Sequence, residues 1–173
     1  MDISYNWLKE YVEFDLAPAE VETILNSIGL EVEGCEVREE VPGGLAGVIV
    51  AEVLECNEHP DSDHLHVTKV NTGEGDPIQI VCGAPNVAAG QKVMLATLNT
   101  KLTFSNGEEI KIKKSKIRGV ESFGMLCAED ELGIGHNHEG IMVLDPAAVP
   151  GTPAKDYLNL KSDIVFTIGL TPN

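Results

Sequence analysis

The chain has 173 residues, which suits one large domain or a medium domain with a small companion. Its hydrophobic share of 43% is enough for a core, and its charged share of 23% argues against global disorder. The formal net charge of −16 makes the chain a poor generic nucleic-acid binder, because phosphate contacts need Lys and Arg. Any contact with RNA must therefore come from a local basic patch.

The beginning of the sequence lacks the basic and apolar parts of a signal peptide. No apolar run approaches the length that spans a bilayer. The four cysteines are widely scattered, which is typical of free thiols in a reducing compartment. The sequence therefore predicts a cytoplasmic chain with no membrane partner.

Two short helices are expected near the amino terminus. Ser4 can cap the first helix, whose apolar side comes from Trp7, Leu8 and Tyr11. Pro18 suits the first position of the second helix. The apolar residues of this second helix recur at the spacing of one buried stripe: Val21, Ile24, Leu25 and Ile28. Residues 30–37 then have the pattern of a strand.

Strand patterns replace helical ones after residue 44. Six candidate strands follow at regular spacing: residues 47–56, 65–71, 78–81, 92–97, 109–114 and 141–144. Asn106 and Gly107, between two apolar segments, are a strong signal for a hairpin turn. Five or six strands in about 110 residues fit an OB-type barrel, and the pattern alone fits a sandwich nearly as well.

Two breaks rich in Pro and Gly, at residues 42–44 and 146–153, divide the chain. We expect a mostly β protein with some α structure, in which an OB-fold barrel is inserted into a small α+β domain. The barrel takes residues 40–150, and the host domain takes residues 1–39 and 151–173. Because insertions are tolerated where chain ends lie close, the barrel should leave and re-enter its host at neighbouring points. The last strand lies so near the end of the sequence that we expect a longer natural protein.

The basic residues concentrate in one short stretch of an acidic chain. Five of them fall within eight positions: Lys111, Lys113, Lys114, Lys116 and Arg118. The alternation around Lys111 and Lys113 places both on the outer face of a strand, with Ile110 and Ile112 inside. This strip is either a solvated face that keeps the chain soluble or a track for a phosphate backbone.

Two kinds of chemistry are alternatives to RNA binding. His64 and His66 lie on one face of a strand, and His136 and His138 repeat their spacing, but no Cys-x-x-Cys pair or His-Glu-x-x-His helix supports a metal site. A thiol nucleophile would need Cys82 or Cys127 beside a histidine, and no recognised local signature surrounds either cysteine. We expect no catalytic residue, metal or cofactor in this chain.

Three motifs in order make a specific signal. Residues 116–133, with the sequence KIRGVESFGMLCAEDELG, closely resemble the signature of tRNA-binding OB domains in aminoacyl-tRNA synthetases and their accessory proteins. Residues 59–63 and 81–87 match two further motifs of that group. The flanking segments 4–12, 28–33 and 163–173 resemble bacterial phenylalanyl-tRNA synthetase beta chains. The resemblance covers essentially the whole sequence.

The resemblance implies an alpha2-beta2 synthetase that joins phenylalanine to its tRNA with ATP and magnesium. In that family the active site lies on the alpha subunit, and proofreading lies in later beta domains. This chain would supply assembly surface and a surface for the tRNA, without chemistry of its own. The tRNA-facing residues would be the basic strip, extended by Ser122, Met125 and Asn86 at positions that match the motifs.

One departure from the family pattern concerns His64, where related domains often carry Lys. A neutral His removes one fixed positive charge from the RNA-facing side. The runner-up functions are a protein–protein assembly module without RNA contact and a free-standing tRNA-binding chaperone. No DNA partner is expected.

Overall fold

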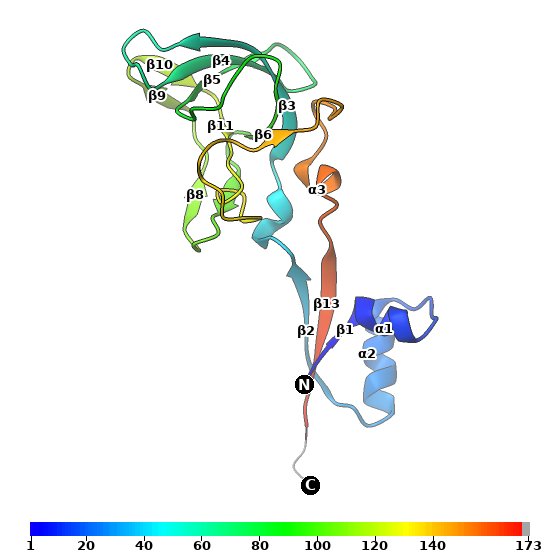
Figure 1. Ribbon diagram of the computed structural model, residues 1–173. Helices are drawn as coiled ribbons and strands as arrows, with labels where there is room; N and C mark the ends of the chain where they lie inside the picture. Colours follow the sequence, from blue (N-terminus) through cyan, green and yellow to red (C-terminus); the bar gives the residue numbers. More distant parts are fainter. Residues whose placement is uncertain (171–173) are drawn as a thin grey trace. The chain divides into compact units, whose positions relative to one another are not determined.

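The computed structural model describes residues 1–170, and they form two compact units (Figure 1). The host unit comprises Met1–Glu40 and the residues from Lys161 on, and the barrel unit comprises Val41–Leu160. The second boundary thus lies later than the expected one after residue 150, because the short helix α3 (Ala154–Tyr157) belongs to the barrel core, with Ala154 fully buried. No helix among residues 1–170 is long and apolar enough to cross a membrane.

The host unit is a three-stranded antiparallel sheet with two helices on one side of it (Figure 1). The strand order is β1 (Asp2–Ser4), β13 (Ser162–Ile168) and β2 (Val32–Glu39). Glu39, the last residue of β2, pairs with Ser162, the first residue of β13. The prediction that the barrel segment leaves and re-enters its host at neighbouring points is therefore confirmed.

Local chemistry sets the starts of the helices α1 (Tyr5–Tyr11) and α2 (Pro18–Ser27). The hydroxyl of Ser4 accepts a hydrogen bond from the backbone N–H of Trp7 at 2.9 Å, as expected of a cap. Pro18 begins α2, and the Glu20 carboxylate accepts a bond from the N–H of Ala17 at 2.7 Å. Both predicted helix starts are confirmed.

The predicted burial of these helices is only partly correct. Val21 and Leu25 are buried, together with Phe166 and Ile168 of β13. Ile24 and Ile28, however, are 45% and 66% exposed, and in α1 Trp7 and Tyr11 are 57% and 71% exposed. A three-stranded sheet covers only the centre of the helical stripe, so the flanks of that stripe stay at the surface.

The barrel unit contains one long sheet that nearly closes on itself. Its strands are β3 (Val48–Glu58), β4 (His66–Asn71), β5 (Ile78–Cys82), β6 (Lys92–Ala96), β11 (Met125–Leu126) and β12 (Val143–Leu144). They run in the order β11-β6-β3-β4-β5, and β12 also pairs with β6. The free edge of β5 approaches the segment that leads into β11, the strand at the other edge of the sheet. The N–H of Phe123 in this segment donates to the carbonyl of Gln79 in β5 at 2.9 Å. The sheet is thus a barrel of the OB type and not a sandwich.

Two hairpins and two short helical turns complete the unit. Strand β7 (Lys101–Thr103) pairs with β8 (Glu109–Lys111) around the predicted Asn-Gly turn, and β9 (Ser115–Ile117) pairs with β10 (Val120–Ser122). The 3-10 turn η1 (Pro42–Leu45) precedes β3, and α3 follows the barrel. These hairpins carry most of the basic strip.

The core of the barrel unit lies on both faces of β3. Val50 faces one buried cluster with Met94 and Ala154, whereas Ala51 faces the barrel interior with Ile80. The register of β3 against β4 shifts between Val53 and Glu55, so that β3 bends at this bulge. A bent, doubly covered strand gives the hairpins a rigid base.

Candidate nucleic-acid interface

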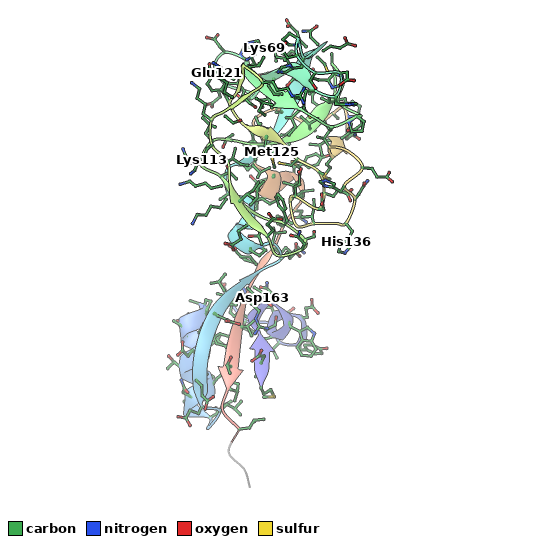
Figure 2. The ribbon with its side chains drawn as sticks, turned by 90° about the vertical axis from the view of Figure 1, so that its left-hand side faces the viewer. Lys69, Lys113, Glu121, Met125, His136 and Asp163 are labelled. Atoms are coloured by element: carbon green, nitrogen blue, oxygen red, sulfur yellow. The ribbon has the colours of Figure 1, made fainter. Side chains whose placement is uncertain are left out.

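The outer face of the β7–β8 hairpin is basic. Ile112 is buried, while Lys111 and Lys113 are exposed on the opposite side, as the alternation predicted. Figure 2 shows Lys113 at the outer edge of the barrel unit. No ion pair or hydrogen bond within residues 1–170 engages the ammonium groups of Lys111 and Lys113, so both charges are open to an anion.

Sequence reasoning missed Lys101, which pairs directly with Lys111 across the hairpin. Like charges directly opposite each other on a sheet are destabilising. An anion between the two ammonium groups would remove this repulsion. The signal was in the sequence: counting outward in equal steps from Asn106 brings Lys101 opposite Lys111.

The remaining basic residues of the strip differ in whether their charged groups have partners within the fold. The Lys114 ammonium lies 3.0 Å from the Glu121 carboxylate and 5.1 Å from the centre of the Phe123 ring. The Arg118 guanidinium donates to the carbonyl of Asp61 at 2.8 Å. Lys116 is exposed and has no such partner among the described residues. The open cations are therefore Lys101, Lys111, Lys113 and Lys116.

The three sequence motifs come together in space beside this strip. His59 is 3% exposed, and its Nε2 lies 3.0 Å from the carbonyl of Ile117. Its Nδ1 accepts a bond from the N–H of Asp61, so we assign the proton to Nε2, which donates to Ile117. Together with the bond from Arg118 to Asp61, this histidine fastens the turn at residues 59–63 to the β9–β10 hairpin.

Two motif residues expected to contact RNA, the buried Ser122 and the exposed Asn86, also make hydrogen bonds within the fold. Ser122 is 1% exposed, and its hydroxyl accepts from the N–H of Val81 at 3.1 Å and donates to the carbonyl of Gly124 at 3.2 Å. The Asn86 amide donates to the carbonyl of Ile141 and accepts from its N–H, at 2.9 and 3.0 Å. The assignment of Ser122 to direct RNA contact needs correction, because its hydroxyl is buried and fully used. Asn86 remains exposed, so its predicted contact with RNA stays a prediction.

Met125, labelled in Figure 2, is half-buried on β11. It lines a hollow of about 390 Å³ next to the strip. Met125 was an expected RNA-facing residue, whereas the lining residues Ile117, Glu131 and His138 were not assigned to that surface. Ile117 and Glu131 lie within the motif of residues 116–133 and His138 lies beyond it, and only the fold shows that all three line one hollow. Gly124, just before Met125, lies so close to β6 that a Cβ there would sit 2.9 Å from the carbonyl oxygen of Ala96.

The structure offers little for the alternative chemistries. Within residues 1–170, no group of three or more His, Cys, Asp or Glu side chains is placed to hold a metal ion. Burial raises the pKa of the Cys82 and Cys127 thiols. A raised pKa disfavours the thiolate that a nucleophile needs.

Comparisons with known proteins agree with this geometry. The family profile tRNA_bind, which describes a tRNA binding domain, matches residues 48–153. The chain belongs to this family. The tRNA_bind domain thus coincides with the barrel unit, and its match includes both hairpins of the basic strip.

Relatives extend the similarity beyond the tRNA_bind domain. The whole chain is 64% identical to the phenylalanine–tRNA ligase beta subunit of Bacteroides thetaiotaomicron and 53% identical to that of Porphyromonas gingivalis. It covers 21% of each, so it spans about a fifth of the length of these curated relatives. The resemblance found in the sequence motifs is confirmed. A solved structure, the C-terminal domain of Plasmodium vivax p43, is 25% identical with a TM-score of 0.42, over 60% of this chain and 56% of that one.

Proposed function

We propose that the chain is the non-catalytic N-terminal region of a phenylalanine–tRNA ligase beta subunit, with a surface for tRNA and a surface for assembly. The observation that supports this most directly is the 64% identity over all 173 residues to a beta subunit of that name. The aligned length includes the host unit on both sides of the barrel. A free-standing tRNA-binding domain would have no reason to share that host.

The parent enzyme proposed here charges the tRNA for phenylalanine in the cytoplasm, using ATP and magnesium. Its alpha subunit would be the assembly partner and would hold the active site in an alpha2-beta2 complex. Within this chain we assign no catalytic residue and no cofactor. The proposed partners are thus the tRNA and the alpha subunit.

The proposed tRNA surface is the set of open cations Lys101, Lys111, Lys113 and Lys116. Lysine at these positions contacts phosphates and carries no sequence preference. The net charge of −16 repels RNA from other faces, and salt screens that repulsion over a Debye length of about 8 Å. The isolated chain should therefore bind tRNA weakly and in one orientation.

The test reverses two of these charges, with Lys111→Glu and Lys113→Glu, in the chain and in the assembled enzyme. Each lost phosphate contact should flatten the slope of log affinity against log salt by roughly 0.7 to 0.9. Titration of tRNA at two salt concentrations gives that slope. The double change Lys69→Glu and Lys155→Glu is the matched control, since it alters the charge equally at exposed positions outside the strip.

Unchanged affinity and salt slope in the assembled enzyme would contradict the tRNA surface and leave the strip as a solubility face. An equal effect of the control pair would show that only the overall charge matters.

A further inference from the structure

The hollow beside Met125 has the form of a small-ligand pocket. Its volume of about 390 Å³ lies within the range of about 300 to 1,000 Å³ that such pockets occupy. Its walls are mainly apolar and come from the end of β5, from β9, from β11 and from residues 138–141: Val81, Ala84, Pro85, Ile117, Leu126 and Ile141. The pocket lies where the three sequence motifs meet, and the contacts described above use its walls but not its interior.

The polar groups of this pocket are mostly acceptors. One oxygen of the Glu131 carboxylate accepts a bond from the N–H of Ala128 at 2.7 Å, and this fixes the side chain in the wall. Glu139 also lines the pocket. His138 is held at the rim by its ring nitrogen, 3.0 Å from Asp130. Two carboxylates repel a phosphate, so the pocket suits a flat or apolar group that carries no negative charge and donates hydrogen bonds.

The position of Ile117 connects the pocket to the basic strip. Ile117, the last residue of β9, lines the pocket, while Lys116, the residue before it in the same strand, is exposed. Neighbouring residues of a strand point to opposite faces. A ligand with a neutral flat part in the pocket and a phosphate outside would therefore meet both features at once, and a nucleotide has this arrangement.

We propose that this pocket holds one unstacked nucleobase that carries an exocyclic amino group, from a single-stranded part of the tRNA. The proposal deepens the function proposed above and rests on it. Sequence-specific recognition of RNA commonly uses splayed-out bases of single strands. An ionised carboxylate only accepts hydrogen bonds, and the amino groups of adenine and cytosine donate, whereas uracil presents a carbonyl oxygen at that position.

The experiment uses the full chain and fluorescein-labelled single-stranded RNA octamers, one of alternating A and C and one of U. We expect the A and C octamer to bind at least about fivefold more tightly, the lower limit for one well-made base contact. Glu131→Gln keeps an acceptor for Ala128 and turns the other position into a donor. It should abolish the preference or reverse it toward U. Glu74→Gln changes the charge equally on a distant loop and should leave the preference intact.

A second variant blocks the pocket without touching the carboxylates. Ala84→Leu adds bulk to the wall and should lower the affinity for the A and C octamer toward that for U. An octamer containing 2-aminopurine gives an independent readout, since this base brightens when it leaves the stack. The brightening should occur with the natural sequence and be absent in Ala84→Leu, with circular dichroism confirming that the variant is folded.

The outcomes separate the two proposals. Equal binding of both octamers, unchanged by either variant, would overturn the base pocket and leave the phosphate surface intact. Absence of binding to any RNA, including tRNA at low salt, would contradict the proposed function itself, and the pocket with it.

Discussion

The host unit and the barrel unit differ in how many hydrophobic residues they bury. The host buries one cluster of four hydrophobic residues, whereas the barrel buries clusters of thirteen and ten. The host also leaves large apolar side chains at its surface: Trp7, Tyr11, Val12, Ile24, Ile28 and Val37. The barrel is thus stabilised mainly by its own core, and the host has little core to lose.

Paired cations occur in both units, and the barrel also has open lysines in its basic strip. In the host, Arg38 lies 2.9 Å from the Asp2 carboxylate and 2.7 Å from that of Glu36, and Lys9 lies over the ring of Tyr5. In the barrel, Lys111 and Lys113 have no such partner among the described residues. The lysines of the strip are thus the cations on which the proposed tRNA surface depends.

The largest expected effect comes from the small host core. Phe166 is fully buried, and Phe166→Ala should cost about 3 to 5 kcal/mol. We expect the host to unfold while the barrel stays folded. The indole signal of Trp7, the single tryptophan of the sequence, reports the host by NMR, and amide signals of β3 and β6 report the barrel.

Met94→Ala is the matched control, because Met94 is fully buried in the barrel. It should destabilise the barrel by about 2 to 5 kcal/mol. Simultaneous loss of both sets of signals in Phe166→Ala would show that the two units unfold as one, and the comparison would fail.

An intermediate effect is expected at Ser122. Ser122→Ala removes the acceptor of the Val81 N–H inside the barrel, and a buried donor without a partner costs about 1 to 3 kcal/mol. Urea unfolding followed by the barrel signals measures this loss. The salt slope of tRNA binding should stay unchanged, since no cation is removed. A slope flattened as strongly as in Lys111→Glu would restore a direct RNA contact for this residue.

The smallest effect is a pH dependence of the host. Burial alone would raise the pKa of Asp163, but hydrogen bonds from the Ser4 hydroxyl and the N–H groups of Asn6 and Ile164 hold this pKa below its usual value. A lowered pKa stabilises the fold above the unfolded value of about 3.9 and ceases to do so as the pH falls through the folded value. Host stability should therefore decline below about pH 4.

Asp163→Asn should flatten this decline, measured by the Trp7 signal between pH 6 and pH 2. A remainder should persist from Asp2, because the Arg38 hydrogen bond also lowers the pKa of that carboxyl. The exposed loop change Asp76→Asn should leave the host curve as it is. An equally steep decline in Asp163→Asn would rule out the proposed role of this carboxyl.

Features that depend on residues a few positions apart could be predicted from the sequence, whereas contacts between distant segments could not. Ser4, Pro18 and the Asn-Gly turn act within a few residues, so the helix starts and the hairpin could be predicted. The exposure of Ile24 depends on how much of α2 the sheet covers. The same holds for the site: the outward lysines followed from alternation, whereas the pairing of Lys114 with Glu121 and the internal bonds of Ser122 required the fold.

The pairing of β2 with β13 has a consequence for the order of folding. Strand β13 is the middle strand of the host sheet and carries Phe166 and Ile168, yet it is made only after the 120 residues of Val41–Leu160. Closing an open loop of that length costs about 4 kcal/mol of chain entropy. A folded barrel removes most of this cost, because Val41 and Leu160, its two ends, pack in the same cluster. During synthesis the barrel should therefore fold first, and its folding brings β13 next to β2 so that the host sheet can form.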